Sequence, residues 1–421
     1  MNIVAPKRRR LVLVGNGMAG IRTLEEILRR TPHAFDIAVF GAEPFGNYDR
    51  IMLSPVLAGE KRFEDIVTHD RGWYRDNGIE LIAGEPAVGI DRHACTVTGA
   101  FGTTRPYDVL LIATGSNPVV IPVPGHTLPG VIAFRDIGDV ETMLAAARGG
   151  AQNAVVIGGG LLGLEAANGL LHNGMNTTVL HLMPTLMERQ LDPASATMLQ
   201  ADLEDRGLTV LTGANTKAIH GTERAEAVEL ADGTILPADL VVMAVGIRPA
   251  IALAKDAGLI CNRGIVVDDG LRTSDPAIYA IGECVEHRGA LFGLVAPLWD
   301  MAKIAADRIS GVAETVFVPA VSGTRLKVTG IDMFSAGNFT GNAASEAILY
   351  RDTAKGVHKK LVLCDDKLIG AVLYGDAGDA GWYFGLIQDG TDISHLRDTL
   401  VFGPPAVAPS EPVGAILLGA S

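Results

Sequence analysis

Residues Val155 to Glu165 read VVIGGGLLGLE, and this stretch decides the fold. Its apolar, partly β-branched start predicts a buried strand over residues 154–157, and the run from Leu161 onward predicts a helix. The first glycine of the turn between them permits a tight bend, the second lets a pyrophosphate approach the backbone, and the third lets helix and strand pack closely. These glycines have the spacing G-x-G-x-x-G and are Gly158, Gly160 and Gly163.

A second loop of this kind occurs near the N-terminus, with the glycines Gly15, Gly17 and Gly20. It lies between an expected strand over residues 10–14 and an expected helix over about 18–30. Glu43 follows the next expected strand, about twenty residues beyond the last glycine, where an acid accepts hydrogen bonds from the ribose of an adenine dinucleotide. Two loops indicate two nucleotides, and the simplest interpretation is a resident flavin at the first and a nicotinamide nucleotide at the second.

A histidine occupies the corresponding ribose position in the second half of the chain. His181 lies in the expected strand over residues 177–182, where an acid would favour NADH by binding its 2′-hydroxyl. A neutral histidine accepts a hydrogen bond from the hydroxyl, whereas a protonated one pairs with a 2′-phosphate. The sequence therefore favours NADH and leaves NADPH open.

The composition is that of a globular protein with an excess of acidic side chains. Of 421 residues, 48% are hydrophobic and 20% are charged, and the net charge is -13. An acidic balance without a concentrated basic patch disfavours nucleic acid and anionic membranes as partners. No apolar run approaches the roughly 18 residues that span a membrane. Two or three domains are expected, because one core seldom grows beyond roughly 250 to 300 residues.

Cysteine usage argues against a metal or dithiol centre. The four cysteines, Cys95, Cys261, Cys284 and Cys364, form no C-x-x-C pair and no cluster with histidines. We therefore expect no iron–sulfur cluster, no structural zinc and no other metal site. Unpaired thiols are typical of the reducing cytosol, so the predicted location is cytoplasmic.

Two stretches predict where the chain passes between its nucleotide-binding halves. An expected buried strand within residues 107–115 leads into a proline-rich linker over 116–130, and a strand with a glycine turn over 240–249 leads back. The predicted fold is α/β, with two Rossmann-like dinucleotide-binding domains and a small α+β C-terminal domain. The expected bounds are 1–116 with 247–312 for the FAD-binding domain, 117–246 for the NAD(P)H-binding domain, 313–403 for the small domain and 404–421 for a mobile tail.

The pattern changes to alternation after Gly311, which predicts strands. Helices are expected over residues 298–309, before this change, and over about 381–387, after it. The expected strands are 324–328, 346–350, 359–363 and 369–373.

The chain resembles the flavoprotein disulfide reductases that have two dinucleotide-binding domains. Within that superfamily it is similar to rubredoxin reductases, to ferredoxin reductases and to the N-terminal reductase part of nitrite reductase large subunits. Residues 47–60 and 186–192 bring it nearest to the nitrite reductase branch. The motifs that carry the resemblance are Gly15 to Gly20 with Glu43, Tyr48-Asp49-Arg50, Ala113-Thr114-Gly115, Gly158 to Glu165, Val245 to Pro249 and Tyr279 to Glu283.

The resemblance implies an FAD site in the first domain. The motif residues Thr114, Gly115, Gly246 and Gly282 are expected to line it. The remaining implied contacts are Gly15, Gly17 and Gly20 with the pyrophosphate, Glu43 with the adenosine ribose, the Val88 backbone with adenine, Arg50 with the flavin or pyrophosphate, Glu283 with the ribityl chain, Trp299 with the ring, and Asp300 with its pyrimidine edge.

The resemblance also implies a catalytic position for Glu165, beside the nicotinamide and flavin N5. In ferredoxin reductases a lysine pairs with this acid, whereas Pro55 occupies the lysine position here. Glu165 is therefore expected to have another partner or to act by positioning alone. The implied residues for the nicotinamide nucleotide are Gly158, Gly160, Gly163 and His181.

These observations predict an NAD(P)H-dependent FAD oxidoreductase, a monomer or homodimer, that passes electrons to a separate redox protein. The acceptor classes left open are a nitrite reductase partner, a rubredoxin, a ferredoxin and a haem protein. One alternative is an NAD(P)H oxidase that uses oxygen or a quinone, although no redox cysteine occurs between Phe45 and Gly59. Another is a flavin-bound assembly protein whose oligomeric state responds to NADH. Hydride transfer depends on alignment more than on an acid or base, so most of the expected site residues are binders.

Overall fold

The computed structural model describes residues 8–326, 328 and 330–405, which form two compact units. The first unit runs to Ser322 and also includes Leu326–Ile331. The second unit comprises Gly323–Arg325 and the chain from Asp332 onward. Residues 406–421 of the predicted tail lie outside the described residues.

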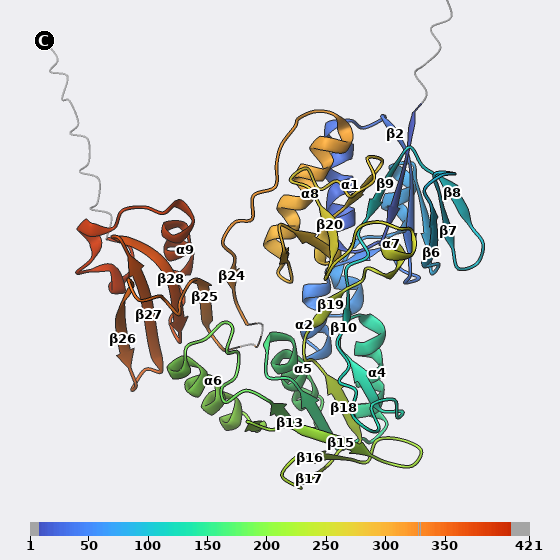
Figure 1. The fold of residues 1–421 in the computed structure, drawn as a ribbon. Coiled ribbons are helices and arrows are strands. Elements are labelled where there is room, and N and C mark those ends of the chain that lie inside the picture. The colour runs from blue at the N-terminus through green and yellow to red at the C-terminus, as the bar shows by residue number, and fades with distance from the viewer. Residues whose placement is uncertain (1–7, 327, 329, 406–421) are drawn as a thin grey trace, which may run out of the picture. The chain divides into compact units, whose positions relative to one another are not determined.

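The first unit contains a five-stranded sheet with the order β21-β9-β1-β2-β5, in which all neighbouring strands are parallel. Leu11 to Val14 are at most 4% exposed, because helices cover both faces of a parallel sheet and make its strands continuously apolar. Helices α1 (Met18–Arg30) and α8 (Val295–Ser310) pack against each other beside this sheet (Figure 1). The strands are β1 (Arg9–Val14), β2 (Phe35–Gly41), β5 (Ile79–Ala83), β9 (Val109–Ile112) and β21 (Ile278–Ala280).

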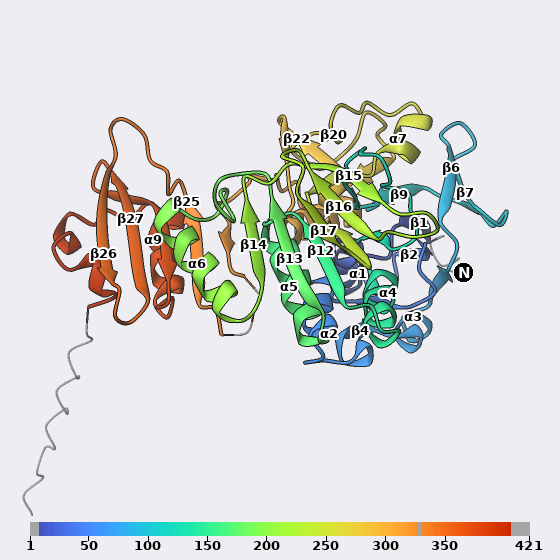
Figure 2. The same cartoon turned by 90° about the horizontal axis from the view of Figure 1, so that it is seen from below.

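A second five-stranded parallel sheet in the same unit repeats this arrangement, with the order β11-β18-β12-β13-β14. Strand β12 is flanked by β13 and β18 just as β1 is flanked by β2 and β9. Figure 2 shows α4 and α5 on one face of this sheet and β15 to β17 on the other. The elements are β11 (Val131–Ala133), α4 (Ile137–Arg148), β12 (Asn153–Ile157), α5 (Leu161–His172), β13 (Asn176–His181), α6 (Pro193–Asp205), β14 (Thr209–Thr212) and β18 (Leu240–Met243).

Two short strands join the parts of the first unit that carry these sheets. Strand β10 (Ser116–Pro118) follows β9, and β19 (Ile247–Pro249) follows β18. They pair antiparallel, with Asn117 opposite Arg248. The chain therefore leaves the first sheet and returns to it through adjacent segments, and the predicted linker begins with a strand.

Smaller elements complete the first unit. Residues of β15 and β16 pack on the second sheet in one apolar cluster. The short strands are β3 (Asn47–Tyr48), β4 (Val67–His69), β6 (Ala87–Asp91), β7 (Thr96–Gly99), β8 (Thr104–Pro106), β15 (Thr216–His220), β16 (Ala227–Leu230), β17 (Ile235–Pro237), β20 (Ile265–Val267), β22 (Val285–His287) and β23 (Ala290–Leu291). The short helices are α2 (Leu53–Leu57), α3 (Arg71–Asp76) and α7 (Ala252–Asp256).

The second unit is an antiparallel sheet with one helix on it, in the order β24-β25-β28-β27-β26. Asp365 and Asp366 have φ angles of 49° and 55°, as a two-residue hairpin turn between β27 and β28 requires. Leu361, Leu373 and Tyr383 lie in its fully buried core. The elements are β24 (Gly323–Thr324), β25 (Met333–Gly337), β26 (Glu346–Asp352), β27 (Val357–Cys364), β28 (Lys367–Tyr374) and α9 (Ala380–Asp389).

Two expected elements differ from the structure by more than two residues at one end. The strand expected over 324–328 is only β24, because Leu326 and Val328 are buried as part of the first unit instead of extending the sheet. The helix expected over 298–309 begins at Val295. Pro297 lies in the first turn of this helix, where proline is tolerated. Within the described residues, no helix combines the length and apolar character needed to cross a membrane.

Candidate functional site: a cavity lined by both glycine loops

A cavity of about 1060 Å³ in the first unit is lined by both glycine loops. It lies beyond the carboxyl ends of both parallel sheets, where open α/β sheets bind their ligands. Most of the predicted site residues line it, and they come from segments spread over almost 300 residues. They are Gly15, Gly17, Glu43, Arg50, Thr114, Gly115, Gly158, Gly160, Glu165, His181, Gly246, Gly282, Glu283 and Trp299.

The first and last glycines of each loop are required by close packing of the backbone. A Cβ atom on Gly15 or Gly158 would lie 2.2 or 2.3 Å from a carbonyl oxygen at the end of a neighbouring strand. A Cβ atom on Gly20 or Gly163 would lie 2.7 or 1.9 Å from the carbonyl oxygen of the first glycine of its own loop. Gly20 and Gly163 therefore do not line the cavity, and they hold helix and loop together.

The middle glycines face open space. A Cβ atom on Gly17 or Gly160 would meet no protein atom within 4 Å. Each glycine is the N-cap of its helix, α1 or α5, and neither cap donates or accepts through a side chain. The amide groups of both helix N-termini, with the positive end of the helix dipole, are thus presented to the cavity. The two loops fit two pyrophosphate groups.

Glu43 is fixed at the end of β2 by two side chains. The guanidinium of Arg50 forms an ion pair with Oε1 of Glu43, and the Tyr48 hydroxyl donates to Oε2 at 2.6 Å. Burial raises the pKa of Tyr48, which keeps the phenol protonated and able to donate. The Arg50 guanidinium also lies 4.9 Å from the centroid of the Tyr48 ring. This predicted ribose acid is therefore held in one orientation.

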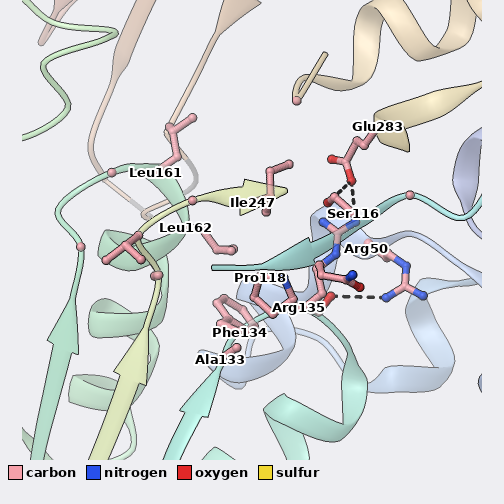
Figure 3. Close-up of a pocket in the computed structure, with 18 of the residues that line it drawn as sticks. Arg50, Ser116, Pro118, Ala133, Phe134, Arg135, Leu161, Leu162, Ile247 and Glu283 are labelled. Carbon is pink, nitrogen blue, oxygen red and sulfur yellow. Dashed lines mark hydrogen bonds and ion pairs between the residues drawn. The ribbon is translucent and has the colours of Figure 1, made fainter. Parts of the chain in front are cut away.

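Glu283 is held in the same way by residues from two other segments (Figure 3). Ser116 Oγ donates to Oε2 of Glu283 at 2.8 Å, and Arg135 Nη2 donates to the same oxygen at 2.5 Å. The carbonyl oxygen of Arg135 in turn accepts from Arg50 Nη1 at 3.3 Å. Ser116 and Arg135 were not predicted. Ser116 directly follows the Thr114-Gly115 motif, whereas no motif singles out Arg135.

Glu165 has a partner that the sequence did not reveal. Ser54 Oγ, on α2, donates to Oε2 of Glu165 at 2.5 Å. Both residues line the cavity. Ser54 immediately precedes Pro55, so the hydroxyl comes from the residue next to the position that a lysine occupies in ferredoxin reductases.

His181 uses both ring nitrogens in protein contacts. The amide of Gly159 donates to Nδ1 at 3.0 Å, and Nε2 lies 3.0 Å from Oε2 of Glu188. Glu188 also lines the cavity. It lies within the stretch 186–192 that the resemblance singled out, but no role was predicted for it.

Two further predicted residues, besides Gly20 and Gly163, do not line the cavity. Val88, on β6, is 59% exposed. Asp300 lies in the second turn of α8 and forms an ion pair with Lys303 at 3.4 Å. Because α8 begins three residues before its predicted start, Asp300 is farther from the helix N-terminus than expected.

Neither a metal cluster nor a lining thiol is found in the part of the chain that the structure describes. No group of three metal-ligating side chains occurs among residues 8–326, 328 and 330–405. The cavity lining contains no cysteine among these residues. Burial raises the pKa of the Cys284 thiol, which disfavours the reactive thiolate.

Comparisons with known proteins agree with this fold. The paired parallel sheets define an oxidoreductase fold with two dinucleotide-binding domains and a C-terminal domain. The chain belongs to the pyridine nucleotide-disulphide oxidoreductase family, whose model matches residues 9–305, and whose members use FAD and NAD(P)H. Residues 323–391 match the rubredoxin NAD+ reductase C-terminal domain. The predicted family and fold class are thus confirmed.

The relatives are named reductases. A nitrite reductase [NAD(P)H] of Bacillus subtilis is 47% identical over 94% of this chain and 49% of its own length. An assimilatory nitrate reductase electron transfer subunit of the same organism is 44% identical over 94% of this chain and 51% of its own. The chain therefore spans about half the length of these relatives. A ferredoxin reductase structure from Rhodopseudomonas palustris is 27% identical, with a TM-score of 0.80 over 89% of this chain and 93% of that one.

Proposed function

We propose that the chain is an FAD-dependent NAD(P)H oxidoreductase that passes electrons to a separate redox protein. The observation that carries this proposal is the single cavity onto which both glycine loops open. Two nucleotides whose pyrophosphates lie at Gly17 and Gly160 would share one cavity, as direct hydride transfer between them requires. FAD supplies the group that accepts a hydride from the nicotinamide and releases electrons one at a time.

The residues around the cavity divide into two sets. Residues 1–116 and 247–312 would hold FAD, through the Gly15 loop, Glu43 and Glu283. Residues 117–246 would hold the nicotinamide nucleotide, through the Gly158 loop. The antiparallel pair of β10 and β19 supports these boundaries, because it lies where the chain passes between the two sets. Residues 313–403 would form the third, small domain.

Glu165 and Ser54 would stand at the junction between the two nucleotides. Glu165 lies on α5, just after the second glycine loop, whereas Ser54 belongs to the segment that follows Arg50. Their hydrogen bond joins the two halves of the cavity. We propose that it holds the carboxylate of Glu165 against the reacting edge of the nicotinamide and helps to exclude water.

The proposed acceptor is a protein. Similarity to an electron transfer subunit, to a nitrite reductase and to a ferredoxin reductase supports this. A cavity lining without cysteine among the described residues gives no support to a thiol-based oxidase or disulfide reductase. We further propose a cytoplasmic monomer or homodimer that binds neither nucleic acid nor membrane, in keeping with its acidic charge.

The proposal is tested with purified protein reconstituted with FAD. Anaerobic mixing with NADH should bleach the flavin absorbance rapidly. Turnover with rubredoxin, ferredoxin or a nitrite reductase partner domain should exceed turnover with oxygen or quinone. A folded protein that takes up no FAD contradicts the proposal, and oxygen as the best acceptor favours the oxidase alternative. Slow turnover with every acceptor, together with NADH-dependent dimerisation, favours the assembly protein.

A further inference from the structure

The imidazole of His181 is already committed within the protein. Its Nδ1 accepts from the amide of Gly159, so the ring proton lies on Nε2 and is donated to Oε2 of Glu188. The side chain of His181 is 10% exposed. His181 thus offers no ring nitrogen to a nucleotide, and its contacts orient the carboxylate of Glu188.

The loop that carries Glu188 is held rigidly against the glycine loop. The amide of Met187 donates to the carbonyl of Gly159 at 3.0 Å, and the amides of Gln190 and Leu191 donate to the carbonyl of Met187 at 2.8 Å. Met187 is buried and has a φ of 50°. Such a left-handed conformation is costly for a residue with a side chain and persists only where the surroundings enforce it.

Gly159 allows this close approach. A Cβ atom on Gly159 would lie 2.5 Å from Cδ2 of Leu186 and 2.8 Å from Cγ of His181. The backbone of the second glycine loop therefore contacts both the histidine and the loop that bears Glu188. In the described chain no partner is found for Oε1 of Glu188, and its side chain is 33% exposed on the cavity wall.

The first half of the cavity has a similar pair in which the acid and the nitrogen-bearing side chain occur in the reverse order. There Glu43 follows the second strand, β2, and its cationic partner Arg50 lies seven residues later. In the second half His181 ends the second strand, β13, and the acid Glu188 lies seven residues later. Beyond the second strand of a dinucleotide-binding unit, an acid accepts hydrogen bonds from the ribose 2′-hydroxyl. Both halves therefore have such an acid. In the first half it is Glu43, directly after the strand, and in the second half it is Glu188, seven residues after the end of the strand.

We infer that Glu188, positioned by His181, binds the adenosine ribose hydroxyls of the nicotinamide nucleotide and makes the chain prefer NADH to NADPH. This rests on the proposed function, because it takes the second loop as the nicotinamide nucleotide site. A carboxylate accepts hydrogen bonds from the hydroxyls but repels a 2′-phosphate. Arg189, which also lines the cavity, is the neighbouring group that would have the opposite effect.

The test is calorimetric titration of the FAD-loaded full chain with NAD⁺ and with NADP⁺. Wild type should bind NAD⁺ the more tightly. Glu188→Gln should weaken NAD⁺ binding about tenfold and strengthen NADP⁺ binding. His181→Ala should raise KM for NADH with little change in kcat, because the side chain of His181 only orients Glu188. Glu223→Gln removes an equal charge from an exposed loop away from the cavity and should leave both affinities unchanged.

Several outcomes would overturn the inference. An unchanged NAD⁺ to NADP⁺ ratio in Glu188→Gln removes Glu188 from the site. Tighter binding of NADP⁺ by wild type, lost in Arg189→Gln, assigns the specificity to Arg189. If FAD is retained but neither nucleotide binds to wild type, the proposed function fails as well, which distinguishes the two failures.

Discussion

Ser54 and Glu165 lie 111 residues apart in the sequence, yet the Ser54 hydroxyl donates a 2.5 Å hydrogen bond to Oε2 of Glu165. Ser54 belongs to a buried short helix and Glu165 to the helix that follows the second glycine loop. The contact ties the two halves of the cavity at the place proposed for hydride transfer.

Removal of this hydroxyl should slow hydride transfer without loss of FAD. We expect Ser54→Ala to lower the rate of flavin reduction by NADH about tenfold, because a hydrogen bond to a charged group is lost. Ser54→Thr, which keeps the hydroxyl, should be closer to wild type. Stopped-flow absorbance at saturating NADH measures both rates. A wild-type rate in Ser54→Ala would show that the bond is structural only.

Paired substitutions at the open glycines should separate the two nucleotide sites. Gly17→Val should abolish FAD uptake, whereas Gly160→Val should retain FAD and raise KM for NADH by on the order of tenfold or more. Both glycines have negative φ angles, -83° and -87°, and a side chain at either would meet open space. Circular dichroism should confirm that both variants fold. Loss of FAD from Gly160→Val but not from Gly17→Val would reverse the assignment.

Arg135 should govern retention of FAD through Glu283. In Arg135→Gln the carboxylate loses its ion pair and retains Ser116 as a donor. We expect the dissociation constant for FAD to rise about tenfold, measured by fluorescence titration of flavin-free protein. Arg148→Gln, at the exposed end of α4, is the matched control. Equal affinities in the two variants would remove Arg135 from the FAD site.

Glu26 should make the first unit sensitive to acid. Burial opposes its ionisation, yet hydrogen bonds from Arg29 and Arg30 outweigh this and lower the pKa of Glu26 from 4.5 to about 2. Because the folded pKa is depressed, its contribution is complete above pH 4.5 and is lost as the pH falls towards 2. By linkage it is about 3 kcal/mol of unfolding free energy at neutral pH.

This contribution can be measured by urea unfolding of flavin-free protein at pH 7 and pH 3. Glu26→Gln should be destabilised at pH 7 and should lose much less stability than wild type on acidification. Glu25→Gln removes a more exposed carboxylate on the same helix and should behave nearly as wild type. An identical pH dependence for Glu26→Gln and wild type would contradict the depressed pKa.

Local patterns were sufficient to predict the framework of the site. The expected strand at 154–157 and the helix from Leu161 agree with β12 and α5, because apolar periodicity and glycine spacing act within a few residues. The strand expected over residues 324–328 was wrong beyond β24, because the apolar residues Leu326 and Val328 are buried in the first unit instead of in this sheet.

What the sequence alone determined is therefore the two loops and their order, since the glycine spacing and the apolar runs that flank each loop lie within a few residues of one another. What only the tertiary structure decided is which side chains meet across the cavity. Arg135 reaches Glu283 across 148 residues, and no spacing rule encodes such a contact. Even His181 and Glu188, which are only seven residues apart, form a pair only because Gly159 lets their two segments approach. The glycine motifs are set by residues close together in the sequence, whereas contacts between side chains depend on how separate segments pack together.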